Sequence, residues 1–425
     1  MNEAFLHYLW QYRLFDPRSL QTSEGNAVEI VKPGRLNTDA GPDFFNAQIR
    51  IDGTLWAGNV EIHINASDWH KHGHHMDAAY DNCILHVVFE KDSAALRKDG
   101  TLIPTIELKD KFPSHLWNNY LQLLGTRGWV PCEPRLKEID QITIHSWLDR
   151  LGTERLEEKT KQIRQFLNWS RNDWEEPFYP HLAKNFGFQV NSLPFELLAR
   201  SLPLRLIRKH SSRLLDVEAL LFGQAGMLNE EFHESYPISL ATEYRHLSKT
   251  YNLKSVNSAA WKFLRLRPSN FPTIRIAQFA QLMMTQENLF SRMMRVENFQ
   301  DGATLFKVTT SDYWRNHFLF DKATEASVKT LGKSSIENIF INTVVPFLFA
   351  WGTEQGSEQH RKKALDILEK IPAEDNQMIR HWEDAGIPSA SALHSQALIQ
   401  LKLHHCAEKK CLSCAIGNQL INTLP

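Results

Sequence analysis

The pattern of apolar and polar residues changes near residue 140 of this 425-residue chain. Before that point, short segments alternate between apolar and polar residues, as strands with one buried face do. After it, apolar residues recur every three or four positions within longer charged segments, which indicates helices. The pattern therefore predicts an α/β domain over residues 1–140 and an irregular all-helical region over residues 141–425.

The first region predicts one mixed sheet flanked by helices. Asp52-Gly53 marks a hairpin, and CILHVVFE is apolar enough for a central strand that is covered on both faces. Pro104 restricts the last strand to an edge, and Gly73 weakens the second helix. The expected elements are a helix at 3–15, strands at 27–32, 46–52 and 55–64, a helix at 68–80, and strands at 83–90 and 101–109.

The second region shows no fixed repeat period, so we expect an irregular helical arrangement and no solenoid. Pro and Gly separate its apolar-periodic segments. Helices are expected at about 143–168, 194–208, 272–284, 335–351, 357–370 and 390–404.

Composition narrows the class of protein. Hydrophobic residues make up 42% and charged residues 23%, and the formal net charge is -1, so any nucleic-acid partner needs a local basic patch. The N-terminus lacks the basic region of a secretory signal, and the apolar run 336–351 is too short to span a bilayer. We expect a cytoplasmic protein without a membrane segment.

Five cysteines argue against a disulfide framework, because the count is odd and the expected compartment is reducing. Cys83 falls in the apolar strand and reads as a core residue. Cys406, Cys411 and Cys414 form C-x4-C-x2-C, a spacing suited to holding a metal. Zn²⁺ is one interpretation, and three reduced thiols on a helical tail are the other.

Candidate chemistry concentrates between Asn37 and His86. Asp43 follows a Gly-Pro turn, and strand alternation puts Glu61 and His63 on one face of the expected strand at 55–64. Two acids from adjacent strands, with the Ile62 carbonyl beside them, supply the hard oxygen ligands that a divalent ion needs. We therefore expect a metal site with Asp43, Glu61 and Ile62 as ligands.

This region resembles the PD-(D/E)xK nuclease superfamily, whose members have a restriction-endonuclease-like fold. Pro42-Asp43 matches the PD element, and Glu61-Ile62-His63 lies where the superfamily has acid, any residue and lysine. The resemblance implies Mg²⁺ or Mn²⁺ at the acids and a catalytic role for the third position. Histidine there lacks the permanent charge of lysine, and Lys32 or Lys71 is an alternative source of it.

The whole chain also resembles a bacterial family of unknown function that is typical of Bacteroidetes. The segments that carry this resemblance are GPDFFNAQI, GNVEIHINASDWHKHGHH, YDNCILHVV, LLFGQAG, RLRPSNFPTIRIAQ and CLSCAIG.

The superfamily resemblance also bears on the cysteines. Some of its nucleases hold a four-iron cluster with one cysteine near the nuclease core and three near the C-terminus. By that resemblance, Cys132 joins Cys406, Cys411 and Cys414 as ligands of an iron–sulfur cluster.

The histidines offer a rival metal site. Imidazole and carboxylate groups suit zinc or iron, and the candidates are His63, His70, His72, His74, His75 and His86 with Asp68 and Asp77. The plainer interpretation is that HKHGHH is a polar helix face and that His86 is a hydrogen-bonded core residue.

A basic segment at residues 261–278 is a candidate nucleic-acid contact. Lys262, Arg265, Arg267 and Arg275 are able to grip phosphate oxygens. The competing interpretation is a salt-bridged junction between helices.

Three functional hypotheses follow. The first is a metal-dependent nuclease that acts on DNA or RNA through Asp43, Glu61 and His63. The second is a catalytically inactive scaffold that binds nucleic acid or protein. The third is a histidine-rich zinc or iron hydrolase for small substrates.

Overall fold

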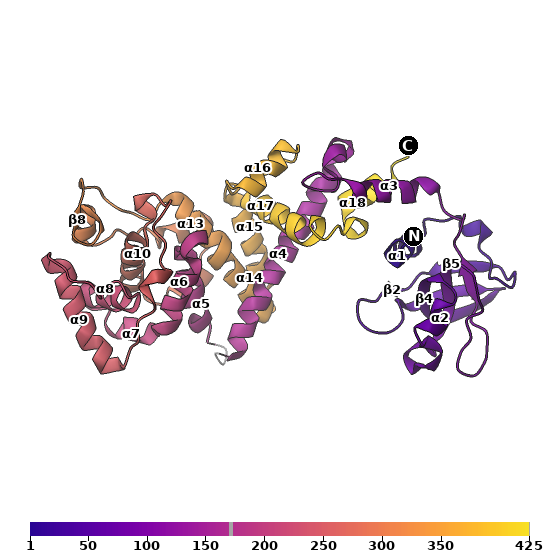
Figure 1. The fold of residues 1–425 in the computed structure, drawn as a ribbon, viewed down its shortest axis with the longest axis horizontal. Helices are drawn as coiled ribbons and strands as arrows, with labels where there is room; N and C mark the ends of the chain where they lie inside the picture. The colour runs from indigo at the N-terminus through magenta and orange to yellow at the C-terminus, as the bar shows by residue number, and fades with distance from the viewer. Residues whose placement is uncertain (170–172, 425) are drawn as a thin grey trace. The chain divides into compact units, whose positions relative to one another are not determined.

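The computed structural model describes residues 1–169 and 173–424 (Figure 1). The chain forms two compact units: unit 1 is Met1–Trp147 with Leu401–Pro425, and unit 2 is Leu148–Gln400. The sequence pattern grouped the C-terminal segment with the helical region, whereas the structure packs it with unit 1. The difference arises because local periodicity identifies a helix without identifying the surface that it packs against.

Unit 1 is built on a mixed six-stranded sheet with the order β1-β3-β4-β5-β6, and β2 pairs with β3. The pairs from β1 to β4 are antiparallel, and β5 runs parallel to both β4 and β6. The strands are β1 (Val28–Lys32), β2 (Arg35–Leu36), β3 (Phe44–Ile51), β4 (Thr54–Asn65), β5 (Cys83–Glu90) and β6 (Thr105–Glu107). A mixed sheet, with the segment after Pro104 at its edge, confirms that part of the predicted fold.

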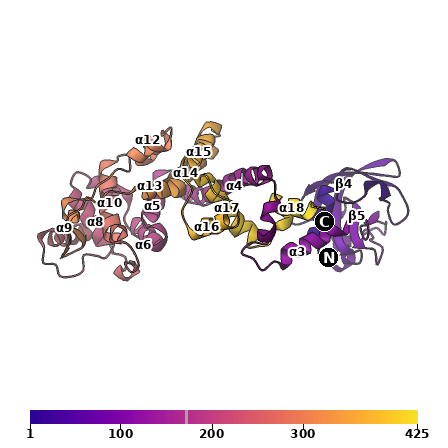
Figure 2. The ribbon, with the colours of Figure 1, turned by 90° about the horizontal axis from the view of Figure 1, so that it is seen from above.

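Helices α1 (Glu3–Tyr12), α3 (Ser114–Gly125) and α18 (Ala415–Asn422) accompany the sheet. α1 begins at Asn2, whose side chain accepts a hydrogen bond from the Phe5 amide, and it packs on β4. α3 and α18 lie side by side in both views (Figures 1 and 2) although residues 126–414 separate them in the sequence. The Asn119 amide group joins them by donating to the carbonyls of Ile421 and Thr423, at 3.1 and 3.0 Å.

The helix expected at 68–80 is mostly absent. α2 covers only Asp68–Lys71, and two short 3₁₀ turns, His74–Met76 and Ala78–Tyr80, follow it. Gly73 has φ = 76°, a left-handed conformation that ends the helix and reverses the chain. The sequence marked Gly73 as a weak point, but it did not show that the helix stops there.

Unit 2 is helical, as the pattern after residue 140 predicts. Its long first helix, α4, begins in unit 1. The helices are α4 (Gln141–Trp169), α5 (Glu175–Phe186), α6 (Phe188–Ser201), α7 (Leu204–Lys209), α8 (Leu214–Gln224), α9 (Ser235–Tyr251), α10 (Pro272–Thr285), α11 (Leu289–Met294), α12 (Phe299–Thr304), α13 (Lys333–Ile339), α14 (Val345–Glu354), α15 (Glu358–Lys370), α16 (Gln377–Asp384) and α17 (Ala392–Gln400). A hairpin of β7 (His317–Leu319) and β8 (Lys322–Ala323) interrupts them.

The apolar segment expected as one helix at 335–351 is α13 and α14 joined by a π-helical turn, Phe340–Val344. Val344, Val345, Phe347 and Leu348 are fully buried in the core of unit 2. Among the described residues, no helix is both long and apolar enough to cross a membrane.

Candidate functional site

Two carboxylates meet where β3 begins beside the middle of β4. Asp43 directly precedes β3, and Phe44 pairs with Val60, so Asp43 lies next to Glu61. The Asp43 amide donates to Glu61 Oε2 at 3.1 Å, and the Ile62 amide donates to Asp43 Oδ2 at 2.9 Å. These reciprocal bonds fix both carboxylates relative to the two strands.

Glu61 and His63 share one face of β4, as alternation predicts. His63 Nε2 lies 3.5 Å from Glu61 Oε1, and both residues are buried. His63 Nδ1 is 2.8 Å from Nε2 of His86, which belongs to the parallel neighbour β5 and pairs with Glu61 in the sheet register. His86 therefore orients the His63 ring from the neighbouring strand.

Two further imidazoles, those of His72 and His74, complete the group from the segment that follows α2. After Gly73 reverses the chain, His74 Nε2 lies 3.2 Å from Glu61 Oε1, and His72 Nδ1 lies 3.2 Å from His63 Nε2. One ring nitrogen each from His63, His72 and His74 lies within 4.8 Å of the other two, which is metal-coordination spacing. The histidine tract is therefore not a uniform polar helix face.

His70 and His75 of the same tract stand apart from this trio. Their rings pack on each other with a centroid separation of 4.9 Å. The histidines of HKHGHH thus divide into two that face Glu61 and His63 and two that pair with one another.

Helix α1 contributes a residue that sequence reasoning missed. His7 Nε2 lies 3.2 Å from Asp43 Oδ2, and its ring meets Phe44 edge-on. A histidine between the apolar residues Leu6 and Tyr8 was the available signal, but the residue that it contacts depends on tertiary packing. With His7, the acidic pair is flanked by imidazoles on both sides.

Burial controls the protonation of this group. Desolvation lowers the pKa of His63 and of His86 to about 3, and neighbouring imidazoles add to the effect. Desolvation also raises the pKa of Glu61, with hydrogen bonding from His74 acting against the rise. His63 is therefore neutral near pH 7: its ring offers lone pairs but does not supply the positive charge that lysine supplies in the resembled motif.

The four cysteines named from the sequence gather in unit 1. Cys132, Cys411 and Cys414 are buried and Cys406 is half-buried. Burial, followed by the effects of Cys414 and Cys411, raises the pKa of Cys132 to about 12. Burial, followed by the effects of Cys132, Cys414 and Cys411, also raises the pKa of Cys406. Cys83, in contrast, lies within β5 as a core residue.

The basic segment of unit 2 separates into exposed and buried parts. Lys262, Arg265 and Arg267 are exposed in the loop before α10. Arg275 is only 5% exposed: its guanidinium donates to Gln278 Oε1 and Ser335 Oγ, at 3.0 and 2.9 Å. A phosphate contact of Arg275 stays a prediction, and in this structure the hydrogen-bond network inside unit 2 uses that side chain.

A hollow in unit 1 adjoins the acidic pair. It encloses about 380 Å³, and His7, which touches Asp43, forms part of its wall together with Lys409 and Lys410. Its other lining residues are Ala4, Tyr8, Gln11, Leu36, Tyr120, Glu408, Leu412 and Ser413.

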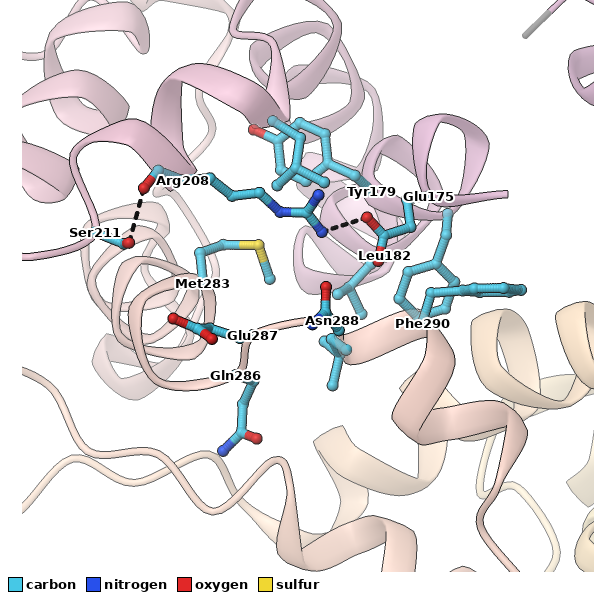
Figure 3. A pocket seen from close by; sticks show the side chains of 13 residues that line it. Glu175, Tyr179, Leu182, Arg208, Ser211, Met283, Gln286, Glu287, Asn288 and Phe290 are labelled. Carbon is cyan, nitrogen blue, oxygen red and sulfur yellow. Dashed lines mark hydrogen bonds and ion pairs between the residues drawn. The ribbon is translucent and has the colours of Figure 1, made fainter. Parts of the chain in front are cut away.

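A second hollow, of about 260 Å³, lies within unit 2 (Figure 3). Glu175 and Arg208 form an ion pair across its wall, and Phe178, Phe290 and Met283 make much of the remainder apolar. Arg208 also accepts a hydrogen bond through its carbonyl from Ser211 Oγ at 2.8 Å. The wall combines this ion pair with a further acid, Glu287, and with apolar side chains, which fits binding of a small amphipathic molecule.

The sheet, the carboxylates and the imidazoles define the class of protein: an α/β unit with a candidate divalent-metal centre, in one chain with a mainly helical unit. Residues 3–377 match the family model described as protein of unknown function (DUF2851), and the chain belongs to that family. No curated protein and no solved structure matches the chain.

Proposed function

We propose that this protein is a metal-dependent hydrolase of phosphodiester bonds in DNA or RNA, with its centre at Asp43, Glu61 and His63. The observation that supports this proposal is the convergence of two strand-fixed carboxylates with imidazoles. The sequence motif requires that Asp43, Glu61 and His63 meet, and the hydrogen bond from Asp43 to Glu61 and the 3.5 Å separation of His63 from Glu61 satisfy that requirement. A restriction-endonuclease-like fold for unit 1 is part of the same proposal.

The donor set fits a divalent ion. Asp43, Glu61 and the Ile62 carbonyl offer oxygen, which suits Mg²⁺ or Mn²⁺, and the rings of His63 and His74 beside Glu61 Oε1 extend the choice to Zn²⁺ or Fe²⁺. A bound ion of this type stabilises charge on a phosphoryl group and lowers the pKa of a water molecule. Because the lowered pKa of His63 keeps its ring neutral near pH 7, that ring is in the form that binds metals.

The protein's own residues position the metal ligands and accept a proton. Asp43 and Glu61 hold each other in place through backbone amides, and His86 fixes the ring of His63 from β5. His72 is the exposed member of the three-histidine group and accepts the proton that the attacking water loses as the bond between phosphorus and the leaving oxygen breaks.

The hollow beside His7 is the proposed approach for the phosphate chain. Lys409 and Lys410 on its wall place positive charge where a phosphodiester enters, although Glu408 pairs with Lys410. The two lysines supply the positive charge that the neutral His63 ring does not provide. The exposed Lys262, Arg265 and Arg267 of unit 2 remain predicted nucleic-acid contacts.

A catalytically inactive scaffold is the second candidate. The observation that favours it is the burial of His63, 2% exposed and held against His86, at the position where the resembled motif has a charged lysine. A protein of this kind binds nucleic acid or protein without cleaving it. The third hypothesis, a zinc or iron hydrolase for small substrates, shares the metal ligands and differs in its substrate.

The test begins with metal-stripped protein and labelled single- and double-stranded DNA and RNA. Adding Mg²⁺, Mn²⁺, Zn²⁺ or Fe²⁺ separately is expected to restore cleavage with at least one ion. Glu61→Gln and Asp43→Asn are expected to reduce the rate by about 100-fold or more, since they remove metal-binding charge. Asp81→Asn, at an exposed acid outside the site, is the matched control and is expected to cleave normally.

Calorimetric measurement of metal binding, compared with the cleavage rate, distinguishes the proposed metal ligand His74 from the proposed proton acceptor His72. His74→Ala is expected to weaken metal binding by about 10-fold or more, whereas His72→Ala is expected to retain binding and lose rate. His75→Ala, from the same tract but paired with His70, is the control. Binding of nucleic acid without cleavage under every metal condition would support the scaffold instead, and hydrolysis confined to small esters would support the third hypothesis.

A further inference from the structure

The hollow in unit 2 lies between three segments that supply different kinds of side chain. Glu175 and Phe178 are one turn apart on α5 and share a face of that helix, and α7 contributes Arg208. The third segment is the end of α10 with the turn that leads into α11, residues 283–290 (Figure 3). All of these residues belong to unit 2, so the hollow is independent of the metal centre proposed in unit 1.

Two aromatic rings form a fixed corner of the hollow. The rings of Phe178 and Phe290 have centroids 5.5 Å apart and an interplanar angle of 64°, so their faces point in different directions. Phe290 is stacked on Trp174 and meets Trp351 edge-on, and Phe178 meets Phe347 edge-on. Because both rings are buried and held by these neighbours, the corner is in place before any ligand binds.

The charged groups of the wall do not cancel. Arg208 extends over the hollow to form an ion pair with Glu175 (Figure 3). Glu287, which is exposed at the rim, has no hydrogen bond or ion pair among the described residues. The lining residues therefore keep one negative charge that no lining cation compensates.

This arrangement favours a positively charged ligand over a negatively charged one. Among the described residues, Arg208 is the only cation that lines the hollow, and an anion would have to displace Glu175 from it. A cation, in contrast, is attracted by the Glu287 carboxylate and by the faces of the aromatic rings, whose quadrupoles are negative there.

The remaining wall and the volume define the rest of the ligand. Leu182, Leu289 and Met283 extend the apolar surface beside the aromatic corner. The hollow encloses about 260 Å³, which is below the roughly 300–1,000 Å³ of sites for drug-sized molecules. A ligand that fits is therefore small and carries a short apolar group.

We propose that this hollow binds a small organic cation in which an ammonium group is attached to a short apolar body. The apolar body packs in the corner formed by Phe178 and Phe290, and the ammonium group is attracted by the carboxylates of Glu287 and Glu175. Arg208 competes with the ligand for Glu175, so this ion pair limits the affinity of the site.

Three probes with one apolar body and different charges test the proposal. Phenethylamine, phenethyl alcohol and phenylacetate are titrated separately into the full-length chain, and calorimetry measures binding. The amine is expected to bind on the order of tenfold more tightly than the alcohol, and added salt is expected to weaken only the amine. Equal affinity for amine and alcohol, tighter binding of phenylacetate, or no binding of the amine at millimolar concentration would overturn the proposal.

Two charge variants have opposite expected effects on binding of the amine. Glu287→Gln is expected to weaken it about two- to fivefold, whereas Arg208→Gln releases Glu175 and is expected to strengthen it about twofold or more. Glu369→Gln, at an exposed acid of α15 outside this wall, is the matched control and should bind the amine as the wild type does.

The Arg208 variant also separates a cation site from an anion site. If Arg208 itself held the ligand, Arg208→Gln would abolish binding, and that result would contradict the proposal. Unchanged affinity of the Glu287→Gln protein for the amine would contradict the role assigned to that carboxylate. Because both substituted side chains are exposed, neither change removes a buried contact of the core.

Discussion

Burial decides what several charged residues do in this protein. Arg275 has the side chain of a phosphate-binding residue, yet its guanidinium lies over the Phe188 ring at 4.6 Å inside unit 2. His63 occupies the place of a lysine but is neutral because it is desolvated. In both cases residue type suggested a role that the environment changes.

Glu218 gives a residue-scale prediction. This acid of α8 is 1% exposed, accepts a hydrogen bond from Ser311 Oγ at 2.8 Å, and has a pKa raised by burial to about 7. The folded protein therefore holds this proton more tightly than the unfolded chain, whose reference pKa is 4.5. The stability contributed by Glu218 is present below pH 4.5 and is lost as the pH rises through about 7.

Glu218→Gln is expected to remove that loss. At pH 8 the variant should be more stable than the wild type by up to roughly 3 kcal/mol, and the two should converge near pH 4.5. Urea unfolding at several pH values, followed by a signal from unit 2, measures the difference. Glu230→Gln, at an exposed acid, serves as the control, and an identical pH dependence in wild type and Glu218→Gln would contradict the prediction.

At the scale of elements, close contacts decide where helices and strands fit together. Gly58 lets β4 approach the chain before β5, since a Cβ there would lie 2.6 Å from the Asn82 carbonyl oxygen. Gly223 has the same role between α8 and α9, where a Cβ would lie 2.0 Å from the Tyr244 ring. Neither glycine is required by its φ angle, so packing explains both.

Gly223→Ala is therefore expected to destabilise unit 2 by roughly 1–3 kcal/mol although alanine favours helices. The Tyr244 ring cannot move aside freely, because its hydroxyl donates to Gln224 Oε1 at 3.0 Å. Thermal or urea unfolding measures the loss.

A double-mutant cycle supplies the control for this contact. Adding Tyr244→Ala to Gly223→Ala is expected to cost less than the sum of the single changes, since the truncated side chain no longer clashes. Gly332→Ser, where nothing lies within 4 Å, should leave stability unchanged. Additive effects in the cycle would show that the Tyr244 contact is not the cause.

At the scale of the whole molecule, the two ends of the chain belong to one unit. The last helix, α18, packs on α3, and Asn422 donates to the hydroxyl of Tyr8 in α1 at 2.7 Å. Unit 1 therefore cannot be completed until residues 401–425 are present, and unit 2 is an insertion between its two parts.

Asn119→Ala is expected to weaken the attachment of α18 to α3. It removes two hydrogen bonds to the end of α18, so amides of that helix should exchange with solvent on the order of tenfold faster, a change that corresponds to about 1 kcal/mol. Hydrogen exchange read by mass spectrometry localises the effect to unit 1. Gln122→Ala, at an exposed position of the same helix, is the control, and equal protection in both variants would oppose this role for Asn119.

The strand pattern predicted a useful part of the candidate site. Alternation placed Glu61 and His63 on one face, and the apolar run at 83–90 predicted a central strand, which brings His86 beside them. These inferences succeed because side-chain direction in a strand depends on local backbone geometry alone. Such inferences cover side chains on one strand and on its direct neighbours, but not contacts with segments outside the sheet.

What the sequence by itself determined is the mixed sheet, the change to helices and the facing of Glu61 and His63. Only the tertiary structure decided that His7 and His74 contact the acids, that Arg275 is buried, and that the C-terminal cysteines belong to the same unit as Cys132. The physical reason is range: periodicity reports the two faces of one segment, whereas these contacts depend on chain reversals such as Gly73 and on packing between segments far apart in sequence.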